Sequence, residues 1–237
     1  MNKFTIVIPI FNEELNIKNL IEEIFQYLTE YENKFDIILI NDASTDDSLK
    51  EINKLVIKYP KIIKLIDNKN NLGQSYSLIE GIKSSVNKTI VTLDGDGQNH
   101  PKDIPILLKK YFFNSGLFLV GGIRLIRKDS FLKIISSKIA NSLRSKILMD
   151  GCPDTGCSLK VFDKDVFMNF PFFKGIHRFL PALYKGFGKD TFFINVSHRH
   201  RLYGKSKYGT FGRLFNGIRD LIKVAKIIRN FKKITIK

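Results

Sequence analysis

The chain has 237 residues, of which 43% are hydrophobic, and a formal net charge of +16. This length suits one α/β domain, and an apolar share of that size excludes a largely disordered chain. The positive charge indicates a polyanionic partner, which is a nucleic acid, an anionic membrane or a phosphorylated substrate.

The cellular compartment is indicated by cysteine usage and by the start of the sequence. Two cysteines, Cys152 and Cys157, are too few for a disulfide framework and are expected to be structural thiols of a cytosolic protein. Met1-Asn-Lys leads directly into a short strand-like run, so no signal peptide is evident. No apolar run reaches the roughly 18 residues that a membrane-spanning helix needs. We therefore expect a cytoplasmic protein that is soluble or peripheral to a membrane.

Strand-like and helix-like segments alternate in the first half of the chain. In chain order they are a strand at 4–10, a helix at 13–32, a strand at 35–40, a helix at 46–59, a strand at 62–66, a helix at 73–86, a strand at 88–93, a helix at 101–111 and a strand at 117–121. Ser44 or Thr45 is expected to cap the second of these helices. Repeated strand–helix units predict an α/β fold with a mostly parallel sheet, right-handed crossovers and flanking helices.

The second half alternates less regularly and ends in a long basic segment. We expect a helix at 130–148, a strand at 158–162, a helix at 176–188 and a strand at 192–196. Over 210–237, apolar residues recur at helical spacing, and lysines and arginines fall largely on the other faces. Such a basic amphipathic helix suits an anionic membrane surface. The alternative is an ordinary helix that packs on the core and leaves its basic side in solvent.

The most informative stretch is 89–98, Thr-Ile-Val-Thr-Leu-Asp-Gly-Asp-Gly-Gln. Its apolar, β-branched run is typical of a buried parallel strand, and ligands of open α/β sheets bind where such strands end. Asp94, Asp96 and Gln98 would place two carboxylates and an amide oxygen at that edge, a ligand set suited to Mg²⁺ or Mn²⁺. The alternative is a polar turn, in which Asp-Gly only reverses the chain.

Polar signals also follow the first and second strands. Glu13 comes after the first strand and Asp42 after the second, and the carboxyl ends of parallel strands share one edge. Acidic residues gathered there would repel one another unless they bind a cation or hydrogen-bond donors, such as those of a ribose or a base. Taken singly, Glu13 could instead be a first-turn residue favoured by the helix dipole. His198 and His200 suggest a metal site, but two histidines beside an arginine are more often solvated or stacked.

Four motifs, in order along the chain, resemble those of the family 2 glycosyltransferases of GT-A fold. They are Ile-Val-Ile-Pro-Ile-Phe-Asn-Glu-Glu at 6–14, Asn-Asp-Ala-Ser-Thr-Asp at 41–46, Asn-Asn-Leu-Gly at 70–73 and Asp-Gly-Asp-Gly-Gln-Asn-His-Pro at 94–101. The chain is most similar to the dolichyl-phosphate mannose synthase branch, which makes polyprenyl-phosphate sugars, although Asn41 and Ala43 replace the family's Asp and Gly. The resemblance covers about residues 3–210 and implies a GT-A (Rossmann-like) domain over 1–209. We expect the basic amphipathic segment 210–237 to be a membrane-interface extension of that domain.

The resemblance also implies roles for residues at the matched positions. It assigns the nucleotide sugar to Pro9, Phe11, Glu13, Asp42, Asp94, Arg201 and Lys207. It assigns a divalent metal to Asp94, Asp96 and Gln98. It assigns the acceptor phosphate and the sugar pocket to Arg124, Ser137, Asp154, Thr155, His177 and Arg178. The residues that it implies for catalysis are Asp96, Arg124 and Lys207.

The reaction implied by the resemblance is an inverting transfer of a sugar from a nucleotide-diphosphate sugar to a polyprenyl phosphate, such as undecaprenyl or dolichyl phosphate. A lipid phosphate carries about −1.5 to −2 charges at neutral pH, so it is a nucleophile that needs no general base. A bound Mg²⁺ or Mn²⁺ would act as a Lewis acid on the leaving diphosphate. The implied place of action is the inner face of the cell membrane, to which the enzyme would bind peripherally.

Three other functions remain as alternatives on sequence alone. One is a family 2 glycosyltransferase that adds sugar to a hydroxyl of a cell-envelope glycan or lipopolysaccharide precursor, where a carboxylate commonly acts as base. Another is a nucleic-acid-binding protein, which the charge suggests but no helix-turn-helix, zinc-finger or aromatic RNA-binding signature supports. The third is a catalytically silent scaffold, against which the intact acidic motif argues. We therefore expect no nucleic-acid partner.

Overall fold

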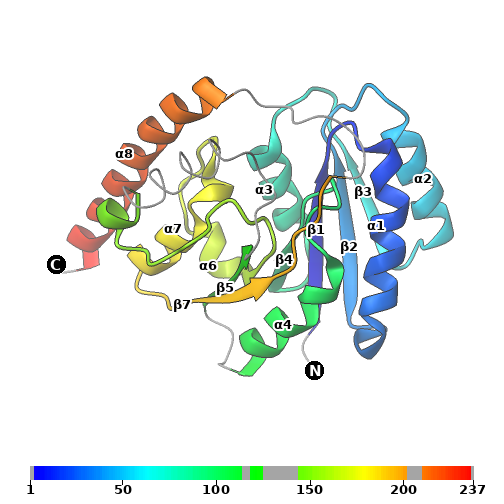
Figure 1. The fold of residues 1–237 in the computed structure, drawn as a ribbon, viewed down its shortest axis with the longest axis horizontal. Coiled ribbons are helices and arrows are strands. Elements are labelled where there is room, and N and C mark those ends of the chain that lie inside the picture. The colour runs from blue at the N-terminus through cyan, green and yellow to red at the C-terminus, as the bar shows by residue number, and fades with distance from the viewer. Residues whose placement is uncertain (1–2, 114–117, 125–143, 202–209, 236–237) are drawn as a thin grey trace.

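The computed structural model describes residues 3–113, 118–124, 144–201 and 210–235. Within these ranges, seven strands form one sheet in the order β3-β2-β1-β4-β6-β5-β7 (Figure 1). The strands are β1 (Phe4–Ile10), β2 (Phe35–Asn41), β3 (Ile63–Asp67), β4 (Thr89–Thr92), β5 (Leu119–Arg124), β6 (Lys160–Asp163) and β7 (Thr191–Val196). The helices are α1 (Glu14–Tyr27), α2 (Ser48–Lys58), α3 (Gln74–Ser84), α4 (Ile104–Phe113), α6 (Lys164–Met168), α7 (Leu180–Gly186) and α8 (Thr210–Thr235). The 3-10 turns are η1 (Thr29–Tyr31), η2 (Pro101–Asp103) and η3 (Ile176–Arg178).

One strand of the sheet runs against the others. β1 pairs in parallel with β2 and β4, β2 with β3, and β5 with β7. β6 is antiparallel to both of its neighbours, β4 and β5. The α/β class and the mostly parallel sheet predicted from the sequence are confirmed. Because β6 is reversed, its first residue, Lys160, pairs with Thr92, the last residue of β4.

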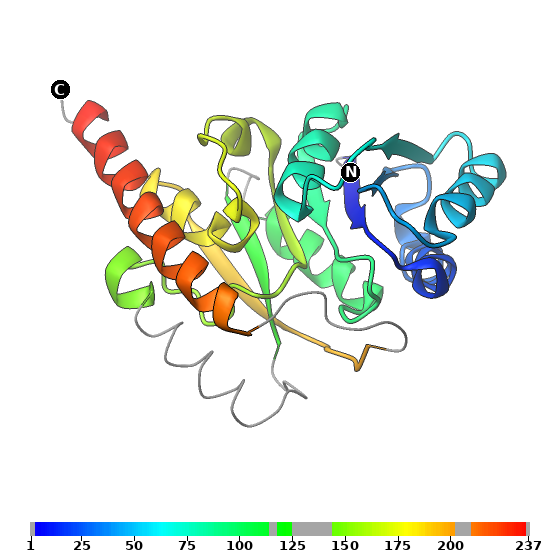
Figure 2. The same cartoon turned by 90° about the horizontal axis from the view of Figure 1, so that it is seen from above.

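Helices cover both faces of the sheet, so the protein has three layers (Figures 1 and 2). Ile6 and Ile8 of β1 pack with α1, α2 and α4 on one face. Val7, which points the opposite way, packs in a second cluster with α3, α7 and α8. Both faces of β1 are therefore buried, which explains why its sequence is a nearly continuous apolar run rather than an alternating one.

The C-terminal helix α8 lies along α7 at one side of the molecule (Figure 2). Leu221, Val224 and Ile228 are buried in the same cluster as α7. Contact is close at Gly186 of α7, where a Cβ would come within 2.5 Å of Ile228. The exposed side of this part of α8 carries Arg219, Lys223, Lys226 and Arg229. Across the ranges that the structure describes, no helix is both long and apolar enough to cross a bilayer.

Several element boundaries differ from those predicted. The helix predicted at 13–32 divides into α1 and η1, and that at 176–188 divides into η3 and α7, in which Pro181 stands in the first turn. The five-residue helix α6 was not predicted, because it is too short to show helical periodicity. Most of the helix predicted at 130–148 lies outside the described residues, and 144–148 are helical.

The predicted capping of α2 by Ser44 or Thr45 is wrong. Asp47 occupies the N-cap position without a side-chain cap bond, and Asp46 Oδ1 accepts the N–H of Ser48, the first residue of the helix, at 3.0 Å. Ser44 Oγ instead accepts the N–H of Asn12 at 3.0 Å, and the N–H of Thr45 donates to Asn12 Oδ1 at 2.8 Å. These residues therefore join the loops after β1 and β2, a tertiary contact that competes with the local cap.

Candidate active site

The loops that follow β1, β2 and β4 meet at one edge of the sheet, as the parallel topology requires. The N–H of Glu13, after β1, donates to Ser48 Oγ of α2 at 2.8 Å. The loop after β4 lies directly on the end of β1, since a Cβ at Gly95 would come within 2.5 Å of Ile10 Cδ1 and 3.2 Å of the carbonyl oxygen of Pro9. A larger residue at this position would force the side chain of Ile10 to move and would crowd the end of β1. The predicted donor residues Pro9 and Phe11 thus belong to the strand end on which this loop rests.

Asp42 is buried and organises the loop that leads into α3. Its carboxylate accepts the N–H groups of Leu72 and Gly73 at 2.9 and 2.8 Å, and Asn68 Nδ2 at 3.0 Å. Gly73 has a φ of 89°, which side chains rarely adopt. The structure therefore gives Asp42 a role in shaping the site wall, while its predicted contact with the nucleotide stays a prediction.

Asp94 and Asp96 stand together in the loop after β4. Asp94 Oδ1 accepts Gln74 Nε2 of α3 at 2.7 Å, and the N–H of Asp94 donates to Ser158 Oγ at 3.2 Å. Asp96 Oδ1 accepts the N–H of Gln98 at 3.1 Å. Burial and the negative charge of Asp96 raise the pKa of Asp94 to about 7. The pair therefore attracts a positive charge.

A positive charge from Arg201 already lies against these acids. Arg201 Nη2 is 2.6 Å from Asp96 Oδ2 and 3.7 Å from Glu13 Oε1. Asn16 Nδ2 donates to the other oxygen of Glu13 at 2.8 Å. Three of the predicted site residues, from segments far apart in the sequence, are thereby brought together.

Arg201 is carried by residues 197–201, here termed the strap, which run along the loop after β4. The N–H of Arg199 donates to the carbonyl oxygen of Gln98 at 2.9 Å, and Arg199 Nε donates to that of Gly97 at 3.0 Å. Its guanidinium also forms two bonds with Glu23 of α1, at 2.6 and 2.7 Å. This pairing lowers the pKa of Glu23. Sequence reasoning missed both residues, because the two histidines flanking Arg199 suggested a metal site and nothing local links it to Glu23.

The predicted acceptor residue Arg124, at the end of β5, is paired with Asp154. Its Nε and Nη2 donate to the two carboxylate oxygens at 2.7 and 2.8 Å, a fork-to-fork geometry. Gly156 gives the guanidinium room, since a Cβ there would come within 2.6 Å of Arg124 Nη2. Thr155 stands between these residues in the loop before β6. Arg124, Asp154 and Thr155 therefore lie close together, while their contact with an acceptor phosphate stays a prediction.

His177 and Arg178 occupy the turn η3 between α3 and α8. His177 Nδ1 lies 2.7 Å from Ser75 Oγ, which also accepts the N–H of Gly175 at 2.7 Å. Burial, followed by the charges of Arg178 and Lys160, lowers the pKa of His177 to about 3, so the imidazole is neutral. Arg178 Nη2 forms an ion pair with Asp220 of α8 at 2.8 Å. Asp220 is the only acidic residue after Arg199 in the sequence.

Two further predicted residues, Lys207 and Ser137, lie outside the residues that the structure describes. One buried cation at this edge was not predicted. Lys160, with only 4% of its surface exposed, donates from Nζ to the carbonyl oxygen of Cys157. The signal that could have identified it is a lysine that interrupts the apolar residues Leu159, Val161 and Phe162 of a predicted strand, because lysine is almost never buried without a partner.

The acidic residues fit a divalent metal that is held largely by its substrate. In the described ranges, no three His, Cys, Asp or Glu side chains gather into a metal cage. Mg²⁺ needs no such cage, since it binds through one or two carboxylates together with water and substrate phosphates, and Mn²⁺ prefers the same oxygen ligands. Asp94 and Asp96 offer those oxygens, and Gln98 Nε2 donates to the carbonyl oxygen of Arg199 at 3.4 Å, which orients the amide.

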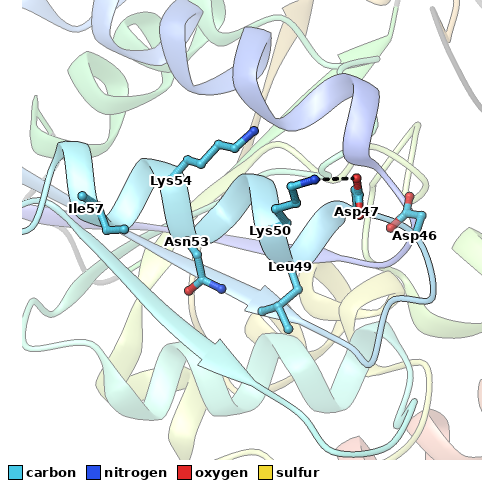
Figure 3. A pocket seen from close by; sticks show the side chains of 7 residues that line it. All are labelled: Asp46, Asp47, Leu49, Lys50, Asn53, Lys54 and Ile57. Carbon is cyan, nitrogen blue, oxygen red and sulfur yellow. Dashed lines mark hydrogen bonds and ion pairs between the residues drawn. The ribbon is translucent and has the colours of Figure 1, made fainter.

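A pocket of about 510 Å³ lies elsewhere, on the outer side of α2 (Figure 3). It is lined by Asp46, Asp47, Leu49, Lys50, Asn53, Lys54 and Ile57. Figure 3 shows the Lys50–Asp47 ion pair at its rim, with an Nζ–Oδ2 distance of 3.2 Å between two largely exposed side chains. The pocket shares only the loop around Asp46 with the site, and the predicted catalytic residues do not line it.

Two solved glycosyltransferase structures share this fold. Glucosyl-3-phosphoglycerate synthase from Mycobacterium tuberculosis, in complex with UDP, aligns with a TM-score of 0.67 and 16% identity over 95% of this chain and 81% of that chain. A mannosyltransferase from Pyrobaculum calidifontis, in complex with GDP-Man and Mn²⁺, aligns with a TM-score of 0.60 and 16% identity over 85% of this chain and 58% of that chain. The GT-A fold expected from the sequence is thereby confirmed.

Sequence comparison defines the family. The model of glycosyl transferase family 2 matches residues 5–170, and the chain belongs to this family. The chain is 34% identical over 230 residues to the dodecaprenyl-phosphate galacturonate synthase of Rhizobium johnstonii, a match that covers 96% of this chain and 68% of that protein. It is 31% identical over 223 residues to the undecaprenyl-phosphate 4-deoxy-4-formamido-L-arabinose transferase of Proteus mirabilis, covering 94% and 67%. The chain thus spans about two thirds of the length of these relatives.

Proposed function

We propose that the protein is an inverting glycosyltransferase that moves a sugar from a nucleotide-diphosphate sugar to a polyprenyl phosphate. One observation carries the proposal: acidic and cationic side chains converge on one edge of the sheet. The relatives that match more than 90% of this chain are named for polyprenyl-phosphate acceptors. The resemblance to the polyprenyl-phosphate branch supports the same reading. The acceptor hydroxyl of the sequence-based alternative has no comparable support.

The donor would lie across the ends of β1, β2 and β4. Glu13 and Asp42 would face the nucleoside, and Arg201 would exchange its contact with Asp96 for the donor diphosphate. The resemblance assigns Lys207 to the same diphosphate. Asp94, Asp96 and Gln98 would hold Mg²⁺ or Mn²⁺, which, when bound, offsets negative charge on the leaving diphosphate. An arginine is suited to this exchange, since it binds carboxylate and phosphate oxygens with the same fork of donors.

The acceptor phosphate would bind at the Arg124 side of the edge. Asp154 holds the guanidinium of Arg124 by two bonds, so its orientation is set before the substrate arrives. A phosphate oxygen of the lipid forms the bond to the anomeric carbon, the bond from that carbon to the diphosphate breaks, and the nucleoside diphosphate leaves with the electron pair. No proton needs to be removed from the nucleophile. A single displacement converts an α-linked donor into a β-linked product.

The lipid acceptor places the enzyme at a membrane surface, and α8 offers the matching charge. Its exposed residues Arg219, Lys223, Lys226 and Arg229 would bind anionic headgroups on the inner face of the cell membrane. Leu221, Val224 and Ile228 are packed in the protein, and Ile222 is exposed among the basic residues, so this part of the helix would bind mainly by charge. In this proposal, 1–209 form the catalytic domain and 210–237 a membrane-interface extension docked on it.

A transfer assay tests the proposal. The protein is incubated with a panel of radiolabelled UDP- and GDP-sugars, Mn²⁺ or Mg²⁺ and a short polyprenyl phosphate, and label is counted in the organic phase. We expect label from at least one donor and its loss when EDTA replaces the metal. Transfer to a glycan hydroxyl, with none to the lipid phosphate, would contradict the proposal.

Asp96→Asn supplies the variant for this assay. The amide keeps the shape of the side chain but removes the charge, so transfer should fall at least about 100-fold, as for the loss of one electrostatic contact in a transition state. Asp165→Asn is the matched control, since Asp165 pairs with Lys88 at an exposed site away from the sheet edge. Wild-type transfer by Asp96→Asn with every donor would refute the mechanism.

A further inference from the structure

Lys160 is a buried cation at the candidate active site to which the mechanism above gives no role. Its side chain donates to the carbonyl oxygen of Cys157, and among the described residues no carboxylate lies within ion-pair distance of its Nζ. An ammonium group carries three hydrogen-bond donors and loses its hydration when it is buried. A protein keeps such a group at a cost to its stability.

The position of Lys160 directs it toward the reacting groups. Lys160 is two residues before Phe162 on β6, so the two side chains share a face of the sheet, and Phe162 packs in the cluster of α3 and α7. Lys160 pairs with Thr92, two residues before Asp94. Its charge opposes the raised pKa of Asp94 and contributes to the lowered pKa of His177, so the ammonium lies near both.

The arginines around this edge differ from Lys160, because each has a carboxylate partner among the described residues. The pairs are Arg124–Asp154, Arg178–Asp220, Arg199–Glu23 and Arg201–Asp96. Their charges are therefore largely compensated in the absence of substrate. Lys160 carries a positive charge at a buried position, and an anionic ligand can compensate that charge.

We propose that Lys160 binds a phosphoryl oxygen of the substrate on the side of the site formed by Asp94 and His177. This inference rests on the proposed function, which brings two such anions to the edge, the diphosphate of the donor and the phosphate of the lipid. A compact ammonium binds phosphate as a point charge, and burial strengthens that attraction. Lys160 is thus retained for binding, at the expense of folding stability.

Lys160→Met tests the inference, because it keeps the length of the side chain and removes its charge. We expect the melting temperature of the ligand-free protein to stay the same or rise. Affinity for the anion should fall about 10- to 100-fold, the effect of losing a hydrogen bond to a charged group. Calorimetry with UDP or GDP and Mn²⁺ measures the donor arm, and the KM for a short polyprenyl phosphate measures the acceptor arm. The arm that weakens identifies which phosphate Lys160 binds.

Lys164→Met is the matched control. Lys164 also donates to backbone carbonyls, those of Lys83 and Ser85 at 2.9 and 2.6 Å, but it lies beyond the other end of β6. Neither affinity should change in this variant. Lys160→Gln, which can still donate to the carbonyl oxygen of Cys157, should weaken binding as Lys160→Met does.

Three results would overturn the inference. One is wild-type affinity for both ligands in Lys160→Met, and another is a lowered melting temperature with both affinities intact. The third is failure of both Lys160 variants to fold, which would make the ammonium a structural group. If the wild-type protein bound a nucleoside diphosphate but transferred no sugar to lipid phosphate, the proposed function would fail. The affinity of Lys160→Met for UDP or GDP, measured by calorimetry, would still test the role of Lys160.

Discussion

Ala43, in the loop after β2, has a left-handed backbone with a φ of 56°. A residue with a Cβ in this region is destabilised by about 1–2 kcal/mol. Glycine removes this strain, but it also increases the entropy of the unfolded chain, which offsets part of the gain. Ala43→Gly should therefore raise the free energy of unfolding by about 0.5 kcal/mol, whereas the β-branched Ala43→Val should lower it by more than about 1 kcal/mol. Urea denaturation measures both. Equal stability of the two variants would contradict the assignment of strain.

Asp94 links metal binding to pH. Burial and the charge of Asp96 raise its folded pKa to about 7, above the unfolded value of about 3.9, so its contribution to stability is complete below pH 4 and is lost as pH rises through 7. A metal ion binds the carboxylate, not the acid. Affinity for Mn²⁺ should therefore fall by about tenfold per pH unit below 7.

Thermal denaturation at pH 6 and pH 8 checks this dependence. The apparent affinity for Mn²⁺, obtained from the stabilisation relative to EDTA-treated protein, should be about tenfold lower at pH 6 than at pH 8. The same metal titration curve at both pH values would show that Asp94 does not titrate between them.

At the scale of elements, the strap connects the last strand of the sheet with the acidic loop and α1. Arg199 makes three of its contacts, two to Glu23 and one to the carbonyl oxygen of Gly97. Arg199→Gln should release the loop that carries Asp96 and Gln98 and weaken Mn²⁺-dependent binding of UDP or GDP by about tenfold, the order of one charge-assisted hydrogen bond. Calorimetry measures the affinity.

Two comparison variants show whether weaker binding in Arg199→Gln arises from loss of the strap's contacts or only from loss of a positive charge. Arg199→Lys should not restore binding, because lysine cannot form the fork to Glu23 and reach Gly97 as well. Lys88→Gln removes an exposed ion pair with Asp165 and should change nothing. Full affinity in Arg199→Gln together with lower thermal stability would assign the strap a structural role only.

At the scale of the whole molecule, α8 presents four exposed basic residues on one side, Arg219, Lys223, Lys226 and Arg229. Each lysine near an anionic leaflet contributes about 1 kcal/mol to binding, so Lys223→Gln combined with Lys226→Gln should weaken binding to phosphatidylserine vesicles by about 30-fold. Vesicle sedimentation at low and high salt measures the effect, which should shrink as salt rises. Lys58→Gln combined with Lys61→Gln, outside α8, is the matched control.

The opposite pattern would assign the membrane contact to another surface. Binding to neutral vesicles as strong as to anionic ones, or equal losses in the α8 variant and its control, would exclude an electrostatic contact through α8. Lipid transfer activity measured with detergent-solubilised acceptor should change little in either variant, because neither touches the sheet edge.

The first half of the fold could be predicted because the sequence patterns of its helices and strands lie within short segments. β1 is a run of apolar residues that ends in polar ones, and α1 and α2 carry apolar residues at helical spacing, so short windows were sufficient. The reversed direction of β6 could not be predicted, because strand direction is set by which partners it meets. The helix that follows β6, α6, has five residues, which are too few to show helical periodicity.

The candidate site divides in the same way. Asp94, Asp96, Asp42 and Glu13 could be named because each follows a strand, and parallel strands end at one edge. Their partners could not be named, because the contacts join residues far apart in the chain. Arg199 reaches Glu23 across 176 positions, and Arg201 reaches Asp96 across 105.

The amino-acid sequence by itself determined the class of fold, the edge at which chemistry can occur and the family of the chain, since strand ends and motif spacing are local properties. Only the tertiary structure decided which charges are compensated. It paired Arg124 with Asp154 and Arg201 with Asp96, and it left Lys160 buried with a backbone carbonyl. The physical reason is that electrostatic free energy depends on distance and burial, and neither is defined until distant segments of the chain have packed together.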